Sequence, residues 1–350
     1  MIEKMTPKER VMAALAGRET DCIPAITPSM GVNLDCMERS GAFFPEAYLA
    51  AAQIAALAET GHTMLGFDSI SPYFSAHLEA VALGCEVQWG DAYHVPIVTK
   101  RAFRDPERFT PPSTFPNRPP CSALLKAIQI LKKKYGGTVP IIGKVIGPWS
   151  LSHFLYGVED LLMDCILAPA KIHALFQQLN DCAIKFAQAQ FDAGADIITW
   201  IDHISSEYFN PGIYEDFLLP LHQKAAGRLS RQGPLIWTIF GDVSDRFELI
   251  GRSGFPVLNI LPSNDIAAAR EQVGEHMLIL GAINNPDILI GGTSADVRRA
   301  VFHSIKSGSR IVAPEAAIST KTPTPNLMEL VRTAHSISGA RPIGSSLAHP

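Results

Sequence analysis

Four acidic or imidazole side chains stand where apolar runs of the sequence end. Asp202 ends the run "DIITWID" and His203 follows it, Asp242 follows "LIWTIFG", and Glu315 lies in "RIVAPEA". Imidazole and carboxyl groups are the usual general acids and bases of enzymes, and a carboxylate next to a histidine raises its basicity. These four residues are the candidate catalytic groups.

The adjacent pair Asp202 and His203 leaves two interpretations open. Neighbouring residues of a strand point to opposite faces, so both side chains reach one site only if the strand has already ended. Either residue can instead cap or orient the helix expected near "NPGIYEDF". The sequence does not decide between a catalytic and a structural role.

Aromatic residues gather at the same places in the sequence. Trp149, Trp200 and Trp237 are three of the four tryptophans of the chain, and each lies near the end of an apolar run. Aromatic walls suit a flat, large or apolar ligand, whereas the alternative is that these rings fill the protein interior. The candidate substrate-binding residues are Tyr73, Trp149, Tyr156, Trp200, Trp237, Thr238, Phe240 and Asn284.

The cysteines do not form a pattern that binds zinc. All six lie within the first 182 residues, and the chain has no C-x-x-C, H-x-C or H-E-x-x-H motif. In a cytoplasmic chain of this size, scattered cysteines indicate reduced thiols and not a disulfide framework. A zinc-thiolate centre is therefore not expected, while an oxygen-rich or single-histidine metal site built from the four candidate catalytic residues remains open.

Composition limits the classes of partner. The chain has 350 residues, 47% of them hydrophobic and 18% charged, and a net charge of −4. The absence of a basic excess argues against nucleic acid as the main partner. No stretch of about 18 consecutive apolar residues and no signal-peptide core is found. We expect a cytoplasmic protein without a membrane anchor, and the sequence leaves its oligomeric state open.

Short apolar runs recur along the chain with helical stretches between them. Runs of this kind are typical of parallel strands that are buried on both faces. The eight runs are 23–29, 64–70, 139–147, 196–202, 235–241, 256–261, 277–283 and 310–316. The clearest helices are predicted over 45–61, 169–194, 211–233 and 294–308, several of them ending in glycine.

Eight strands alternating with helices predict an α/β fold, a (β/α)8 TIM barrel that spans residues 1–350 as one domain. In such a barrel the catalytic residues lie at the carboxyl ends of the strands, where the four candidates stand. A doubly wound open sheet is the alternative, but no G-x-G-x-x-G follows a strand.

A long insertion is expected after strand 2, at about 74–120. Its sequence predicts a hairpin followed by a proline-rich passage. The insertion would lie on the face where barrel active sites form. Two roles of the insertion are open. It acts as a lid or partner-docking surface, or it only stabilises the fold.

Four passages carry a family resemblance. "TPKERVMAALAGRETDCIPA" resembles the start of the uroporphyrinogen decarboxylase superfamily. "GHTMLGFDSISPYFSAHLEAVALGCEVQWGD", "AGADIITWIDHISSEYFNPGIYEDFLLPLHQK" and "IVAPEAAISTKTPTPNLMELV" are similar to its methylcobamide:coenzyme M methyltransferase branch. The resemblance implies a (β/α)8 barrel that moves methyl groups to or from a corrinoid (methylcobamide) held by a partner corrinoid protein.

The decarboxylase branch fits less well. Its members bind a polyanionic tetrapyrrole with an arginine-containing stretch after strand 1, where this chain has "PSMGVNLDC". Phe154 stands where the resemblance places a catalytic tyrosine, and Tyr156 is two positions further on. Porphyrinogen decarboxylation is therefore not expected.

The zinc ligands of the methyltransferase branch are replaced. The resemblance places a His-x-Cys-Gly at the end of strand 5 and a Pro-Gly-Cys after strand 8. Here Thr238, Phe240 and Ala316 occupy the three ligand positions, and Glu315 replaces the glycine. Zinc lowers the pKa of a thiol in those enzymes, so its loss implies a substrate that needs no thiol activation. An aryl methyl ether or a methylated amine would serve, with Co(I) as nucleophile.

In this interpretation Asp202, His203, Asp242 or Glu315 acts as the general acid, and the aromatic residues hold a small-molecule methyl donor or acceptor. Two alternatives stay open. One is a decarboxylase or lyase that acts on a small carboxylate. The other is a non-catalytic protein that binds a corrinoid or a tetrapyrrole.

Overall fold

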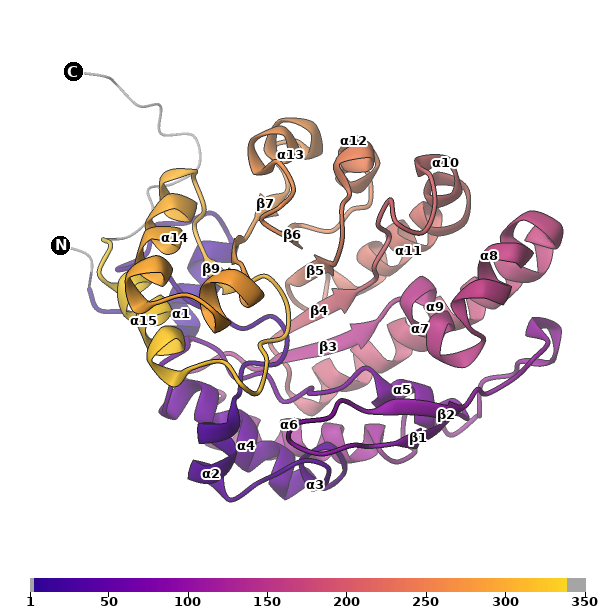
Figure 1. The fold of residues 1–350 in the computed structure, drawn as a ribbon, viewed down its shortest axis with the longest axis horizontal. Coiled ribbons are helices and arrows are strands. Elements are labelled where there is room, and N and C mark those ends of the chain that lie inside the picture. The colour runs from indigo at the N-terminus through magenta and orange to yellow at the C-terminus, as the bar shows by residue number, and fades with distance from the viewer. Residues whose placement is uncertain (1–2, 339–350) are drawn as a thin grey trace.

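Parallel strands form the centre of the molecule. The computed structural model describes residues 3–338, and Figure 1 shows the helices around the outside of the strands. Almost every residue of these strands is buried, as expected from their apolar sequences. One five-stranded sheet contains, in spatial order, β3 (Ile142–Ile146), β4 (Ile197–Ile201), β5 (Leu235–Ile239), β6 (Val257–Ile260) and β7 (Leu278–Ile279).

The remaining strand runs connect the two edges of this sheet. β8 (Gly281–Ile283) follows β7 almost directly and pairs in parallel with β9 (Val312–Pro314). Ala25 forms a parallel bridge to β9, and Ile70 forms a parallel bridge to Ile141 at the start of β3. A backbone hydrogen bond from the second run to Ala25 joins the first two runs. The pairings form a circuit through all eight predicted runs, so the (β/α)8 barrel prediction is confirmed.

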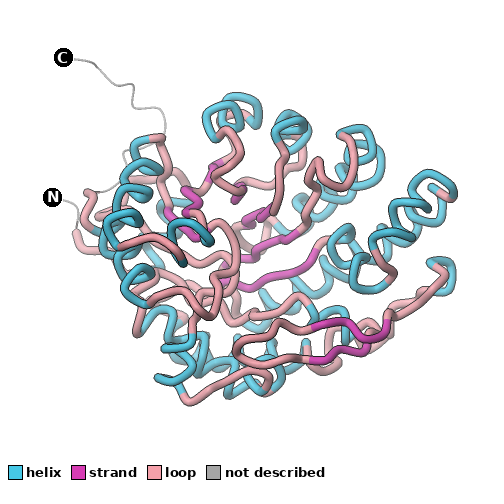
Figure 2. The backbone as a smooth tube through the Cα atoms, viewed as in Figure 1, coloured by secondary structure: helices cyan, strands magenta, loops and turns pink. Residues whose placement is uncertain are grey.

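Helices cover the outside of the strands (Figure 2). The longer ones are α1 (Pro7–Leu15), α4 (Ala51–Thr63), α6 (Cys121–Tyr135), α7 (Pro148–Leu155), α8 (Val158–Leu167), α9 (Pro169–Ala193), α11 (Leu219–Leu229), α13 (Ile266–Val273), α14 (Ser294–Lys306) and α15 (Thr324–His335). Shorter turns of helix are α2 (Leu34–Ser40), α3 (Glu46–Leu49), α10 (Pro211–Ile213), η2 (Tyr214–Leu218), η3 (Ser244–Arg246), α12 (Phe247–Gly251) and η4 (Asn285–Ile290). No helix among the described residues combines the length and the apolar content needed to cross a bilayer.

Two helix boundaries differ in how well the sequence predicts them. α9 ends at Gly194, whose φ of +115° is the left-handed conformation that glycine adopts without strain, as the sequence predicted. The helix predicted over 45–61 is instead divided, because Ala50 is extended with φ −111° and ψ 120°. This divides the segment into α3 and α4.

The insertion contains the predicted hairpin. After α5 (His77–Ala82), strands β1 (Glu86–Gln88) and β2 (Ile97–Lys100) pair in antiparallel fashion. A short turn of helix, η1 (Pro106–Arg108), and the proline-rich passage lead to α6. The hairpin lies next to α5 in Figure 1.

Apolar residues close the barrel at the amino ends of its strands. Val11 and Ala14 of α1 belong to the same buried cluster as side chains from the strand runs. These strand-run residues are Ile26, Ile142, Ile197, Ile236, Val257, Leu280, Ile311 and Ala313. An interior filled at this end leaves the carboxyl ends of the strands as the place for a cavity.

Candidate active site

A cavity of about 680 Å³ lies at the carboxyl ends of the strands. Ile146 and Ile201, the last residues of β3 and β4, lie in its wall together with Thr238 of β5. Asn285 after β8 and Ala316 after β9 complete the ring of strand ends. The cavity therefore occupies the position where barrel enzymes bind their substrates.

The insertion forms one wall of this cavity. Residues 91–96, the loop between β1 and β2, all line it. The loop is held by the segment that follows β9, because Thr320 donates a hydrogen bond from Oγ1 to the carbonyl oxygen of Ala92 at 2.8 Å. The Lys321 ammonium lies 6.0 Å from the centre of the Tyr93 ring. The loop thus covers part of the cavity.

His203 lines the cavity in one defined tautomer. Because β4 ends at Ile201, His203 lies beyond the strand. The backbone N–H of Phe240 donates to His203 Nδ1 at 2.9 Å. A backbone amide can only donate, so Nδ1 accepts, and the neutral ring carries its proton on Nε2. Burial lowers the pKa of His203 to about 4, so at neutral pH the ring offers an N–H donor and carries no charge.

Asp202 lies beneath the cavity and does not line it. It is fully buried. Its carboxylate accepts hydrogen bonds from the backbone N–H groups of Ser150 at 2.7 Å and Trp149 at 3.4 Å, and from His222 Nε2 at 2.9 Å. Asp202 therefore supplies the cap that Gly147, which has no side chain, cannot give to α7. The two adjacent candidates do not meet in one site, and the geometry favours a structural role for Asp202.

Glu315 is also outside the cavity wall. It is 3% exposed and accepts hydrogen bonds from the Asn285 backbone N–H at 2.9 Å and from Asn284 Nδ2 at 3.3 Å. Burial raises the pKa of Glu315. Asn284 caps η4 by accepting from the Asp287 N–H at 2.7 Å. Glu315 and Asn284 thus fix the turn that presents Asn285 to the cavity.

Asp242 lies on the surface. It is exposed, and its carboxylate accepts a hydrogen bond from the Ser244 backbone N–H at 2.9 Å, which lowers the pKa of Asp242. It is absent from the lining of the cavity. The structure thus places only His203, of the four candidate catalytic residues, in the cavity wall.

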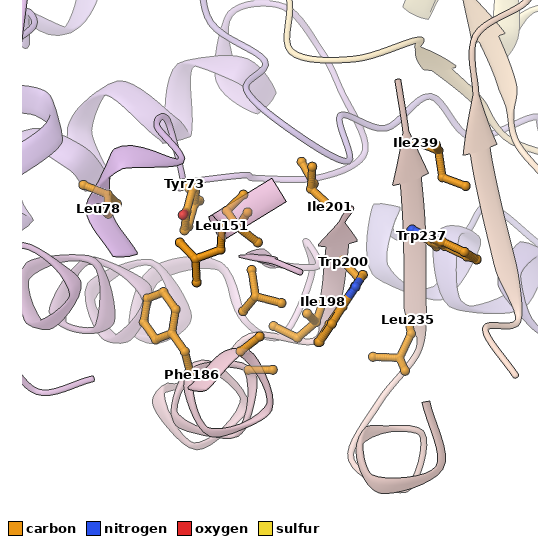
Figure 3. Close-up of a cluster of buried hydrophobic side chains, with 14 of the residues drawn as sticks. Tyr73, Leu78, Leu151, Phe186, Ile198, Trp200, Ile201, Leu235, Trp237 and Ile239 are labelled. Carbon is orange, nitrogen blue, oxygen red and sulfur yellow. The ribbon is translucent and has the colours of Figure 1, made fainter. Parts of the chain in front are cut away.

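The predicted tryptophan wall is wrong. Trp149, Trp200 and Trp237 are fully buried, and none lines the cavity. Thr238 does line it, so its strand neighbour Trp237 must face the opposite side. There Trp237 packs 5.3 Å from Phe255, ring centre to ring centre. Figure 3 shows Trp200 and Trp237 among buried apolar side chains.

Two tyrosines predicted to bind substrate also point away from the cavity. Tyr73 donates a hydrogen bond to Glu79, and Tyr156 donates one to Asp164 at 2.7 Å. Thr238 and Phe240 do line the cavity, as predicted. The aromatic residues of the actual wall are Phe44, Tyr48, Phe74, Tyr93, Phe154 and Phe240.

Sequence reasoning missed several polar residues of the wall. His77 and His153 line the cavity, and His153 Nε2 is buried without a hydrogen-bond partner among residues 3–338. Asn285 Oδ1 is also buried and has no hydrogen-bond partner among residues 3–338. Lys144, the one charged residue in the run "VPIIGKVIG", lies in β3 and also lines the cavity. A lysine inside a buried strand was the signal available in the sequence.

The residues at the expected zinc positions do not fit zinc. Thr238, Phe240 and Ala316 all line the cavity, so the three positions belong to one site. They offer one hydroxyl and no thiolate or imidazole, the groups that zinc prefers. Within the described part of the chain, no three His, Cys, Asp or Glu side chains are grouped so that they could hold a metal ion.

Comparison with known proteins gives a near full-length match. Residues 6–337 match the sequence model of the family described as Uroporphyrinogen decarboxylase (URO-D). Methylcobamide:CoM methyltransferase MtbA of Methanosarcina acetivorans is 31% identical over 332 residues, which cover 94% of this chain and 97% of that protein. A methylated-thiol–coenzyme M methyltransferase of Methanosarcina mazei is 30% identical and covers 95% of this chain. A uroporphyrinogen decarboxylase of Microcystis aeruginosa is 26% identical over 60% of this chain.

A solved structure has the same architecture over almost the whole chain. A methyltransferase from Methanosarcina mazei superposes with a TM-score of 0.91 at 25% sequence identity, covering 95% of this chain and 99% of that one. A B12-independent methionine synthase from Shewanella gives a TM-score of 0.53 at 12% identity, which shows a likeness of fold alone.

Proposed function

The chain belongs to the uroporphyrinogen decarboxylase family, in its methyltransferase branch, and we propose that it transfers a methyl group between a small molecule and the cobalt of a corrinoid carried by a partner protein. The sequence similarity to methylcobamide methyltransferases over 94% of the chain supports this activity. The observation that carries the finer proposal is the convergence of Thr238, Phe240 and Ala316 on one cavity without a zinc ligand among them.

The methyl donor proposed here is an ether or amine, and no activated thiol is required. The two Methanosarcina methyltransferases that match the sequence at 31% and 30% identity act on coenzyme M, a thiol, by their names. A thiol attacks as its thiolate, which zinc generates by lowering the thiol pKa. Thr238, Phe240 and Ala316 cannot hold that zinc. Removing a methyl group from oxygen or nitrogen requires instead that the leaving atom be stabilised.

His203 is the residue suited to that task. The corrinoid supplies the nucleophilic cobalt when its carrier protein is bound. His203 lines the cavity, and its neutral ring carries the proton on Nε2. A donor that is fixed before the reaction stabilises the negative charge that develops on a leaving ether oxygen, whereas a methylated amine leaves as the neutral amine from its ammonium form. Phe154 and Phe240 line the same cavity and provide apolar surface for the body of the methyl donor.

The test follows the cobalt absorption bands of a purified corrinoid protein. We expect the Co(I) bands to be replaced by methyl-Co(III) bands when the enzyme is added with one of a panel of aryl methyl ethers and methylamines. His203→Phe should slow this change by about 10²-fold or more, because it removes the donor. Asp242→Asn, on the surface outside the cavity, is the matched control and should leave the rate unchanged.

Two outcomes would contradict the proposal. One is the absence of any cobalt change with every donor and with coenzyme M as acceptor. The other is one equivalent of zinc in the purified protein by elemental analysis, together with methylation of coenzyme M. Ligand binding without turnover, unaffected by His203→Phe, would point to the non-catalytic alternative.

The decarboxylase alternative has less support. The described residues that line the cavity include no arginine of the kind that binds a polycarboxylate tetrapyrrole, which argues against porphyrinogen decarboxylation, whereas the single carboxylate of a small substrate could pair with Lys144. Phe154 lines the cavity at the position where the resemblance places a catalytic tyrosine. Release of carbon dioxide without a corrinoid protein would revive this alternative.

A further inference from the structure

Lys144 is a buried cation at the cavity wall. It lies in the middle of β3, among strand residues that are all buried, and is itself only 6% exposed. Lysines are rarely buried in this way unless a partner compensates the charge, because removing an ammonium group from water is costly. The group that compensates the charge of Lys144 therefore has to be identified.

The protein supplies little to this ammonium group. Among residues 3–338, its hydrogen-bond partner is the neutral Ser29, 2.9 Å from Nζ, and Nζ lies 4.5 Å from the centre of the Tyr73 ring. An ammonium group has three N–H donors. Arg10 and Arg246, two other buried cations, each form a salt bridge with a carboxylate. Lys144 forms none with any described residue.

Glu79 interacts electrostatically with Lys144 but forms no salt bridge with it among residues 3–338. Glu79 is fully buried, accepts a hydrogen bond from Tyr73 and lies outside the cavity lining. Burial raises the pKa of Glu79 to about 8. Burial also lowers the pKa of Lys144 to about 7. Desolvation is the main cause of both shifts, and the charge of each group partly offsets the shift of the other.

We propose that Lys144 and Ser29 form an anion subsite, and that the small molecule bound in this cavity carries a carboxylate or a sulfonate group on an apolar body. The ammonium group gains the counter-charge that the protein does not provide, and the Ser29 hydroxyl adds a second donor. Ile146 and Phe154 offer apolar surface for the body of the ligand. The assignment of this anion as the methyl donor rests on the proposed function. The binding of an anion at Lys144 does not depend on that function.

Calorimetric titration with three probes of one shape tests the subsite. The probes are 4-methoxybenzoate, 4-methoxybenzenesulfonate and the neutral 4-methoxybenzamide, each titrated into the full chain at pH 7 without corrinoid protein. We expect at least one anion to bind about tenfold or more tightly than the amide. The two anions distinguish a carboxylate ligand from a sulfonate ligand. Equal affinities for all three probes would overturn the proposal.

Lysine variants show which side chain supplies the positive charge that binds the anion. Lys144→Met removes the charge and keeps an unbranched side chain only one atom shorter, and it should weaken anion binding by about 10- to 100-fold while leaving amide binding unchanged. Lys100→Met removes an exposed lysine of the hairpin that does not line the cavity, and it should change the affinity by less than about threefold. Lys321→Met removes the other lysine of the cavity wall and tests whether that charge binds the anion instead. Loss of anion binding in Lys321→Met but not in Lys144→Met would refute the subsite.

A second readout keeps the proposal testable if Lys144→Met folds poorly. Ser29→Ala should weaken anion binding severalfold without changing any charge. In addition, an anion beside Lys144 raises its affinity for a proton, so binding at pH 8 should take up protons, measured in two buffers of different ionisation enthalpy. Glu79, Tyr73 and His203 are the other titratable groups that face Lys144, and Glu79→Gln shows whether the proton goes to Glu79 instead.

The result is separable from the methyl-transfer test. An anion preference that depends on Lys144, found together with unchanged cobalt bands, would leave the subsite standing and remove only the methyltransferase proposal. Methyl transfer from neutral donors alone, with no anion preference, would do the reverse.

Discussion

Four histidines line the cavity, and burial lowers the pKa of three of them, His77, His153 and His203, to about 4. The ordinary value is near 6.5, so between pH 4 and 6.5 the unfolded chain binds more protons than the folded one. The stability that these neutral rings contribute is complete above pH 6.5. It is lost as the pH falls from 6.5 toward 4.

Urea unfolding at pH 4.5 and at pH 7 measures this loss. Each such histidine adds up to about 1.4 kcal/mol per pH unit to the slope of stability against pH. His153→Phe removes one titrating ring and the unpartnered Nε2, so we expect a free energy of unfolding about 1 kcal/mol higher at pH 7 and a shallower slope. His173→Phe, a ring on α9 outside the cavity, is the control. An unchanged slope in His153→Phe would show that this ring is already charged in the folded state.

At the residue scale, the sequence located some members of the site and missed others. His203, Thr238 and Phe240 follow from the rule that barrel chemistry lies at the carboxyl ends of strands. Trp237 could have been rejected in advance, because it is adjacent to Thr238 and must face the other side of the strand. The rule does not identify Lys144, because this lysine lies in the middle of its strand and not at the end.

At the scale of elements, Asp202 joins a strand to a helix. It follows β4 and accepts hydrogen bonds from the first turn of α7 and from His222 of α11. Its carbonyl oxygen also accepts a hydrogen bond from Trp237 Nε1 at 3.4 Å. One side chain thus sets the relative position of β4, α7 and α11, and α7 carries Ser150 and His153 into the cavity wall.

We expect Asp202→Asn to lower the free energy of unfolding by about 3 kcal/mol, because an amide nitrogen would then face donors that need an acceptor. Chemical denaturation followed by circular dichroism measures the loss. Asp192→Asn, an exposed position on α9, should change stability by less than about 0.5 kcal/mol. Equal stability of the wild type and Asp202→Asn would mean that the carboxylate does not anchor these elements.

The elements themselves were predicted with uneven success. Continuous apolar runs identified all eight strand positions, yet the first two runs form only isolated bridges, at Ala25 and Ile70. The division of the helix at Ala50 could not be predicted, since "PEAYLAAAQIAALAETG" has high helix propensity throughout.

At the scale of the whole molecule, distant parts of the chain share one interior. Phe109 and Phe115 of the insertion belong to the same buried cluster as the barrel tryptophans, and the Phe115 ring lies 5.9 Å from that of Phe186 in α9. Asp68, in the second strand run, accepts hydrogen bonds from both ends of the described chain. The donors are Arg10 of α1 at 2.6 Å and His335 of α15 at 2.7 Å. The first and last helices are tied to the second strand run.

We therefore expect the barrel and its insertion to unfold as one domain. Urea unfolding should give a single transition, with the same midpoint by tryptophan fluorescence and by far-ultraviolet circular dichroism. An earlier transition confined to the insertion would show that residues 74–120 fold separately from the barrel. The prediction of one domain over the whole chain would then be wrong.

The hairpin also carries an optical probe of its own movement. Trp89 is half-buried and stacks 5.6 Å from Tyr48, a residue of the cavity wall, while the other three tryptophans of the chain are fully buried. Iodide in solution should therefore quench the emission of Trp89 selectively. A ligand that draws the 91–96 loop over the cavity would change that quenching, so closure of the loop is open to measurement without attaching a dye.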